Sequence, residues 1–331
     1  MEGDFLYNQV ETILEQYEIE INQVTKGRGA YICDTNQGMK LLTGFRGSKE
    51  RGEFLSEFLR ELKENGFEAE QIYFNKEGMA VTTDELTEEH FILKDYIAGT
   101  ELNTSSFEEM KHAAELLAIY HNATQNMQVE PYIFGKENEK MITEIRKRHY
   151  REFVKVRNYI RNRKKKSEFE RIYMEHYEVM SKKAKESVEL LETLPQEELI
   201  PVFCHGDYNQ HNIVLKEDKR YLLNFETVNY SFPMTDLANY IRKMLEKNNW
   251  DTFYGMQLIA SYDKIRPISK TEYKQLYALL LFPEKFWKVT NHYMNSHKAW
   301  ISARDIEKVE KVIAQEENRT KFLESLFSFV L

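Results

Sequence analysis

The sequence predicts an α+β fold with two parts: a small antiparallel sheet that carries one helix, followed by a larger helical part. Two observations predict this division. Short apolar runs separated by glycines fill the first hundred residues, whereas apolar residues recur at helical spacing after Gly99. We therefore expect two domains, residues 1–98 and 99–331. The separating glycines are Gly27, Gly29, Gly38, Gly44, Gly47, Gly52, Gly66, Gly78 and Gly99.

The first part has the pattern of a hairpin, then a helix, then further strands. Runs 30–35 and 39–42 flank Asn36-Gln37-Gly38, which is typical of a tight turn between antiparallel strands. A helix is expected over 48–65, ended by Asn65-Gly66. Strands are expected over 71–74, 79–82 and 91–97. The apolar positions of the helix are Phe54, Leu55, Phe58, Leu59 and Leu62.

The second part is expected to be mostly helical. Residues 108–121 place Met110, Ala113, Ala114 and Leu117 on one face. Long helices are expected over 136–194, and the last sixty residues are helical in pattern and rich in aromatic residues.

Charge, cysteine content and the length of the apolar stretches argue against a nucleic-acid-binding, disulfide-rich or membrane-spanning protein. The net charge of −8 argues against a general nucleic-acid binder, and two cysteines provide no disulfide framework. The first residues lack the layout of a signal peptide, and the apolar stretches are far shorter than a bilayer span of about 20 residues. These features predict a soluble cytoplasmic protein without a membrane partner.

One segment has the composition of a catalytic loop. An apolar run leads into His205-Gly206-Asp207, Asn212 follows five residues later, and a hairpin with a charged turn returns to Asn224-Phe225-Glu226. Asp236-Leu237-Ala238 stands further on. A chance surface loop is the alternative, but the series resembles that of the aminoglycoside phosphotransferase and choline kinase superfamily. The resemblance implies a bilobal protein-kinase-like fold, with a sheet-containing, nucleotide-binding-like N-lobe over 1–98 and a helical C-lobe over 99–331 that carries the His205-Gly206-Asp207 loop.

Phosphoryl transfer depends mainly on positioning and charge neutralisation, which gives these residue types a rationale. We expect Asp207 to lie beside an acceptor hydroxyl as the catalytic base, and His205 to orient the loop. The metal ligands on the phosphates of ATP are expected to be Asn212, Asn224 and Glu226, with Mg²⁺ as the ion. Asp236 is expected to be structural, and Cys204 to be a buried filler.

A closer resemblance, over nearly the whole chain, is to the spore coat CotS family of spore-forming Firmicutes. The matching stretches are Gly44–Phe54, Phe91–Glu101, Ala113–His121, Arg242–Lys247 and Phe282–Lys288. This resemblance implies a protein deposited in the spore coat, whose partners are other coat proteins or a small-molecule substrate.

Two departures from the superfamily pattern argue against phosphoryl transfer. Thr43 stands where the pattern has the lysine that pairs the α- and β-phosphates, and Lys40 has an odd offset that directs it to the opposite face of the strand. Arg46 is a weaker substitute. Asn224 replaces the metal-binding Asp, although Mg²⁺ prefers carboxylates. Glu226, two residues further on, either supplies the missing metal-binding carboxylate or is only the acidic residue that often follows this motif.

The remaining nucleotide contacts rest on the resemblance. Glu53 or Glu57 would be the helix carboxylate that holds the lysine. A solvated helix face is the alternative for both, and it is favoured for Glu57. Gly27 and Gly29 would cover phosphates or form a simple tight turn. The segment Asp95-Tyr96-Ile97 would present backbone groups to an adenine.

A basic stretch, Arg146–Lys166, is predicted to be a helix with one positive face. This face either binds an anionic partner or is an ordinary solvated helix face, since lysines with buried stems and solvated ammonium groups are common. Nucleic acid is a third and weaker choice.

Three functions remain: a degenerate kinase that acts by binding, an ATP/Mg²⁺-dependent phosphotransferase on a hydroxyl-bearing small molecule, and a nucleotide-binding scaffold without turnover.

Overall fold

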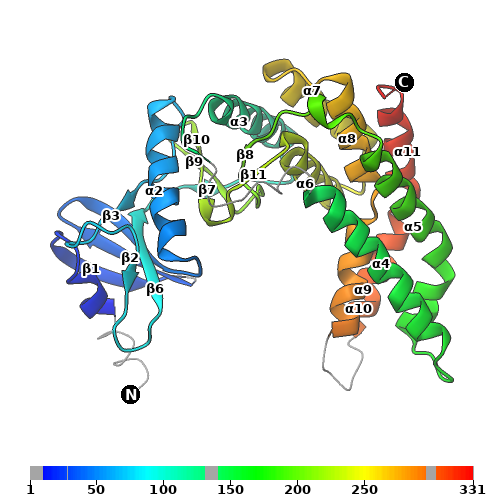
Figure 1. The fold of residues 1–331 in the computed structure, drawn as a ribbon, viewed down its shortest axis with the longest axis horizontal. Helices are drawn as coiled ribbons and strands as arrows, with labels where there is room; N and C mark the ends of the chain where they lie inside the picture. Colours follow the sequence, from blue (N-terminus) through cyan, green and yellow to red (C-terminus); the bar gives the residue numbers. More distant parts are fainter. Residues whose placement is uncertain (1–9, 28, 131–140, 296–302, 331) are drawn as a thin grey trace. The chain divides into compact units, whose positions relative to one another are not determined.

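The computed structural model describes residues 10–27, 29–130, 141–295 and 303–330 (Figure 1). Two compact units make up these residues. The first contains the described parts of Met1–Leu102, Asn122–Gly135 and His205–Asn229, and the second contains those of Asn103–His121, Lys136–Cys204 and Tyr230–Leu331. The hairpin after Asp207 thus belongs to the same unit as the N-terminal sheet. Two independent domains meeting at 98/99 stay a prediction.

The first unit is built on an antiparallel sheet, as expected. Its strands are ordered β1-β2-β3-β6-β4, and β5 also pairs with β6. A second sheet has the order β10-β9-β7. The bounds are β1 Ile21–Lys26, β2 Ala30–Thr35, β3 Gly38–Phe45, β4 Ile72–Tyr73, β5 Thr82–Thr83, β6 His90–Asp95, β7 Thr100–Glu101, β9 Ile213–Lys216 and β10 Lys219–Leu222.

The helix α2, Lys49–Glu64, forms at its predicted place beside the sheet (Figure 1). The Ser48 hydroxyl accepts a hydrogen bond from the Arg51 N–H at the start, and the Asn65 N–H bonds the last turn. The prediction for the strand over 79–82 was less accurate. This strand shrinks to β5, because the Asn75 side chain accepts from Met79 N and folds 75–79 into a turn.

The sheet has two chemically different faces because side chains alternate along each strand. One face buries Cys33, Leu42 and Leu93 against the helical residues 10–14. Leu41 lies directly opposite Lys94 on the other face, in the register of β3 and β6. Lys94, which follows the apolar run Phe91-Ile92-Leu93 of β6, therefore points to the face that does not carry this core.

The second unit is mostly helical, as expected. Its strands β8 Val202–Cys204 and β11 Asn229–Ser231 pair with each other. The helices are α3 Phe107–Gln125, which continues past this unit, α4 Met141–Arg161, α5 Glu168–Glu192, α6 Pro233–Lys247, α7 Thr252–Ile265, α8 Lys270–Leu281, α9 Glu284–Asn295, α10 Ala303–Ala314 and α11 Glu316–Phe327. None of the helices in the described ranges is both long and apolar enough to cross a membrane.

The basic stretch does not form one helix through Lys166. The helix α4 ends at Arg161, and a turn leads to Ser167, whose side chain forms a capping box with Glu170 and starts α5. Phe153, Val156 and Ile160 form the buried stripe of α4 and pack in one core with α5, α9 and α10. Figure 1 shows α4 and α5 side by side.

A buried ion pair helps to hold α4 in place. Arg146 bonds the carboxylate of Glu284, at the start of α9, and Lys288 lies 3.2 Å from the same carboxylate. Burial opposes ionisation of Glu284, but Arg146 and Lys288 outweigh it and lower its pKa to about 2. Arg146 is therefore a packing residue, although it belongs to the basic stretch.

Replacing Glu284 with Gln is expected to destabilise the protein by about 3 kcal/mol at pH 7, from the lowering of its pKa from 4.5 to about 2. Because the folded-state pKa is lowered, this stability is present above pH 4.5 and is lost as the pH falls towards 2. Urea unfolding of both proteins from about pH 7 to about pH 2.5 measures the difference, which should shrink in that window. Glu178→Gln, in the exposed pair with Arg157, is the control and should change stability by less than about 1 kcal/mol. A gap between wild type and Glu284→Gln that stays constant over the whole pH range would contradict this assignment.

Candidate functional site

The loop that carries Asp207 is held by its own side chains. His205 is fully buried, its Nε2 donates to the Leu223 carbonyl at 2.9 Å, and its Nδ1 accepts from Asp207 N at 3.3 Å. Both ring nitrogens are thus used to fix the loop backbone. This arrangement agrees with an orienting role for His205, and it leaves neither nitrogen for proton transfer.

Gly206 is required for the same turn. Its φ is +81°, and a Cβ at this position would lie 2.3 Å from the Thr227 carbonyl oxygen. The Thr227 hydroxyl in turn donates to the His205 carbonyl at 3.0 Å. The loop therefore packs against the segment that follows the hairpin too closely for any side chain.

The loop between Cys204 and Ile213 brings Asp207 and Asn212 together, as the spacing predicts. Asn212 Nδ2 donates to the Asp207 carbonyl at 2.9 Å and lies 3.4 Å from Asp207 Oδ2. Between β9 and β10, Glu217 and Asp218 both have positive φ, which is the tight two-residue turn that matches strand twist. The Asp207 side chain is exposed, whereas Asn212 is buried.

The predicted metal ligands meet, but their oxygens face N–H donors. Asn224 Nδ2 donates to Asn212 Oδ1 at 2.9 Å. Asn224 Oδ1 accepts from Lys94 Nζ at 3.0 Å, and Glu226 Oε1 accepts from the same nitrogen at 2.6 Å. A divalent cation needs lone pairs directed at it and prefers carboxylates. This arrangement does not fit Mg²⁺, and we derive no catalytic step through a metal here.

Lys94 and its carboxylate partner Glu70 were missed in the sequence. Glu70 Oε1 lies 3.0 Å from Lys94 Nζ and also accepts from Asn224 N at 2.8 Å. Burial alone would lower the pKa of Lys94, but the carboxylates of Glu70 and Glu226 raise it, so the ammonium stays protonated. The only signal was a lysine within the apolar run of β6.

Helix α2 anchors the segment after Asn224. The Arg51 guanidinium donates to the Val228 carbonyl and, at 3.3 Å, to the Glu226 carbonyl. Phe58 of the same helix packs on Phe225, with ring centroids 6.1 Å apart, and Phe225 packs on His205. Residues 224–228 are therefore held both by Lys94 of the sheet and by α2.

The predicted lysine position carries no cation in this structure. Thr43 lies opposite Ala30 and Ile92 in the sheet, on the face of Lys94. Lys40 lies on the other face, as its offset predicts, and bonds the Tyr73 hydroxyl and Asp95. Glu53 accepts from Ala80 N at 2.8 Å, so it holds the 75–80 turn.

Backbone groups of the connecting segment are partly used within the sheet. Asp95 N donates to the Gln71 carbonyl and Tyr96 N donates to the Met39 carbonyl. Within the described residues, Ile97 N makes no such bond, so it is the N–H group of this segment left for a ligand. Gly27 N bonds the Ala30 carbonyl, which closes the β1–β2 turn.

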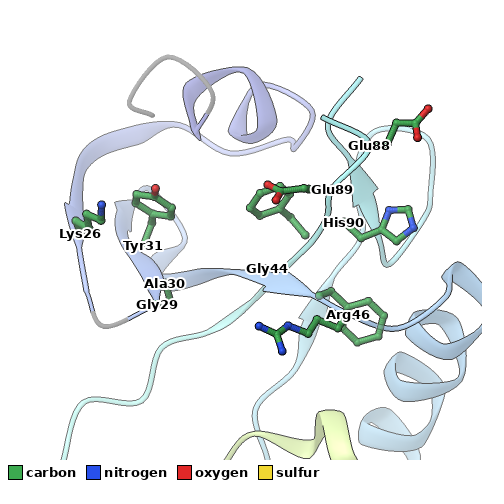
Figure 2. A pocket seen from close by; sticks show the side chains of 11 residues that line it. Lys26, Gly29, Ala30, Tyr31, Gly44, Arg46, Glu88, Glu89 and His90 are labelled. Carbon is green, nitrogen blue, oxygen red and sulfur yellow. The ribbon is translucent and has the colours of Figure 1, made fainter. Parts of the chain in front are cut away.

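A hollow of about 550 Å³ lies at the end of the sheet, and Figure 2 shows its lining. Gly29 and Arg46 line it, together with Lys26, Tyr31 and the residues 88–91. None of Asp207, Asn212, Asn224 or Glu226 contributes to this hollow. Arg46 therefore lines a hollow to which none of the predicted metal ligands contributes.

Similarity to known proteins places this chain in a family. The family described as "Spore coat putative kinase YutH" matches residues 10–326. The chain belongs to this family.

Individual proteins similar to this chain agree with the family match. The chain is 25% identical to spore coat protein S of Bacillus subtilis, over 96% of this chain and 93% of that protein. An aminoglycoside phosphotransferase from Alicyclobacillus acidocaldarius has a TM-score of 0.84 at 19% identity, covering 97% of this chain and 96% of that one. An amicoumacin kinase in complex with AMP-PNP and Ca²⁺ has a TM-score of 0.61 at 14% identity, covering 96% of each chain. The expected aminoglycoside-phosphotransferase-like α+β fold is confirmed.

A second cluster in this family member has metal-ligand residue types. His121, Cys204 and Asp236 are buried, with candidate ligand atoms within 4.8 Å of one another. Both nitrogens of His121 already have partners, the Tyr262 hydroxyl at 2.7 Å and Asp236 at 3.4 Å. Burial lowers the pKa of His121 despite Asp236, which favours the neutral ring. We interpret the cluster as a packed polar contact among α3, β8 and α6.

Gly206→Ala is expected to destabilise the protein by about 2 kcal/mol or more, because the side chain would meet the Thr227 carbonyl in a left-handed conformation. Gly78→Ala is a matched control: φ is +77°, and no atom lies within 4 Å of the added Cβ. It should cost only about 1 kcal/mol. Denaturant midpoints measure both, and equal losses would show that the close packing of the loop contributes nothing.

Proposed function

We propose that this protein is a degenerate kinase-fold component of the spore coat that acts by binding, without transferring phosphate. The observation that carries the proposal is that Asn212 Oδ1, Asn224 Oδ1 and Glu226 Oε1 each accept a hydrogen bond from an N–H donor. The replacement of the phosphate lysine by Thr43 supports it independently. Loss of one preorganised charge contact commonly costs about 3 kcal/mol of transition-state stabilisation, and two such contacts are missing. Deposition in the coat is inferred from the family and from the name of the Bacillus relative.

A second candidate is an ATP-dependent phosphotransferase that uses Asp207 as the base towards a small hydroxyl-bearing substrate. The exposed Asp207 carboxylate beside Asn212 favours it. A third is a nucleotide-binding scaffold without turnover, which the available Ile97 N–H favours. Both require nucleotide binding, so one measurement separates them from the first proposal.

Thermal unfolding with ATP, with and without Mg²⁺, is expected to show no Mg²⁺-dependent stabilisation. A nucleotide present at about 100 times its Kd would add about 2.7 kcal/mol, which is readily measured. A Mg²⁺-dependent rise would overturn the proposal. In that case Asp207→Asn, assayed with candidate acceptors, divides an active enzyme from a scaffold, because only an active enzyme would lose turnover.

For the binding role we propose the exposed basic face of α4 as the contact with an acidic coat protein. The basic stretch divides into paired and unpaired cations. Lys147, Arg157 and Arg163 form ion pairs with glutamates of the same unit. Arg148, Arg151 and Lys155 are exposed at spacings of three and four residues, so they share one helix face.

The positive charge of this face is available to a partner, because none of its three cations forms an ion pair within the described structure. Arg161, Lys164 and Lys165 extend the exposed positive charge beyond the end of α4. Opposite charge across an interface steers association and fixes its register. An acidic protein partner is favoured over nucleic acid, since the whole chain carries a net charge of −8.

Reversing Arg148, Arg151 and Lys155 to Glu is expected to abolish localisation of a fluorescent fusion to the forespore surface in sporulating cells. The fold should be kept, because the three side chains are exposed. The control reverses three exposed lysines elsewhere in this unit, Lys182, Lys274 and Lys311, and should localise normally. Normal localisation of the first variant, or loss in both, would contradict this surface. Tight binding of the wild type to duplex DNA, lost in the first variant, would assign the face to nucleic acid instead.

A further inference from the structure

Lys94 is the most completely buried cation near the candidate metal position. Its side chain is 2% exposed, that of Glu70 is 3% exposed and that of Glu226 is 30% exposed. An ammonium has three N–H donors, and Lys94 has three acceptors: Glu70 Oε1, Asn224 Oδ1 and Glu226 Oε1. Its hydrogen-bonding capacity is therefore full without any ligand.

Two of these acceptors are the oxygens that the sequence pattern assigns to the metal. Lys94 Nζ lies 3.0 Å from Asn224 Oδ1 and 2.6 Å from Glu226 Oε1. A divalent cation bonded to both oxygens would have to displace the ammonium, or sit beside a positive charge in a poorly solvated site. Two like charges a few ångströms apart repel strongly where water screens them poorly, and a dication doubles the repulsion that a single positive charge would meet.

The third acceptor explains why Lys94 stays in this place. Glu70 is buried, and besides Lys94 it accepts the backbone N–H of Asn224. Asn224 has φ 64° and ψ 64°, a left-handed conformation that asparagine tolerates better than most residues. The Glu70 carboxylate thus fixes both the ammonium and the backbone whose side chain the ammonium holds.

The same contacts argue against Lys94 as a relocated phosphate ligand. A lysine that binds phosphate needs free N–H donors and exposure to the ligand, and Lys94 has neither. Turning towards a nucleotide would leave the buried Glu70 unpaired, which is strongly unfavourable.

We propose that Lys94 replaces the divalent cation of the kinase fold: its ammonium holds Asn224 and Glu226 in place and excludes a metal ion. Lys94 is thus a positioning residue for the 224–226 segment. The substitution of Asp by Asn at 224 and the presence of a lysine at 94 are two parts of one change, because Glu70 and Glu226 already give the buried ammonium two carboxylates, and an Asp at 224 would add a third. This inference deepens the proposed function and rests on it.

Mn²⁺ alone, titrated by electron paramagnetic resonance, tests the proposal without any reaction. Wild type and Asn224→Asp are expected to bind no Mn²⁺ at this site, since the ammonium remains. The decisive pair is Glu70→Gln/Asn224→Asp and Glu70→Gln/Lys94→Met/Asn224→Asp, which differ only at residue 94. The Glu70→Gln change keeps the side-chain oxygen that accepts Asn224 N and avoids an unpaired buried carboxylate. The triple variant is expected to bind Mn²⁺ at least tenfold more tightly than the double.

A matched control removes a positive charge elsewhere in the same unit. Glu70→Gln/Lys63→Met/Asn224→Asp has the same net charge as the triple variant, and Lys63 is exposed on α2. It should bind Mn²⁺ no better than the double variant. Circular dichroism checks folding, and Lys94→Gln takes the place of Lys94→Met should the triple variant unfold. Equal Mn²⁺ affinity in the decisive pair would overturn the role of Lys94.

The outcomes also separate this inference from the proposed function. Mg²⁺-dependent stabilisation of the wild type by ATP contradicts the proposed function directly. Equal Mn²⁺ affinity in the decisive pair, without nucleotide binding by the wild type, contradicts the inference alone. Metal-free ADP binding that is present in the wild type and lost in Glu70→Gln/Lys94→Met would show that Lys94 is a phosphate ligand, and would overturn the inference.

Discussion

One buried ammonium organises the candidate site. Lys94 joins β6 to the segment after the hairpin through Glu70, Asn224 and Glu226, and its burial makes each of these contacts necessary. A buried charge without partners is costly, so the three acceptors must stay where they are as long as the chain is folded. The burial of this charge therefore helps to fix the conformation of residues 224–226. With Asn224 Oδ1 held by Lys94, Asn224 Nδ2 is directed towards Asn212 and donates to its Oδ1.

Helix α2 supplies a second, independent support for the same segment. Arg51 satisfies the carbonyls of Glu226 and Val228, and Phe58 packs on Phe225, which contacts the ring of His205. In an active member of the fold, such rigidity would preorganise metal ligands. Here the same scaffold holds a lysine and two asparagines. The proposed binding role rests on this combination of a kinase-like fold with a lysine and two asparagines at the candidate metal position.

Much of the fold followed from local pattern. The hairpin of β2 and β3 and the helix α2 begin and end near their predicted residues, since turn and cap chemistry acts over a few residues. Prediction was weaker in two places. Glu53 bonds Ala80 N, 27 residues away, and so takes a residue of the predicted strand into a turn, which has no signature in that segment. Ser167 ends the basic stretch by capping a new helix, and here Ser167 and Glu170 do have the spacing of a capping box, a local signature that the predicted single helix ran through.

By itself, the sequence determined the fold class, the convergence of Asp207 with Asn212 and the two departures at Thr43 and Asn224. These depend on spacing and residue type, which are local properties. Only the tertiary structure decided which side chains contact Asn224 and Glu226. Lys94 meets Asn224 and Glu226 across 130 and 132 residues of chain, and no periodicity within β6 identifies such partners. Hydrogen bonds to a buried ammonium form only when the sheet and the hairpin have folded together, so their chemistry depends on folding.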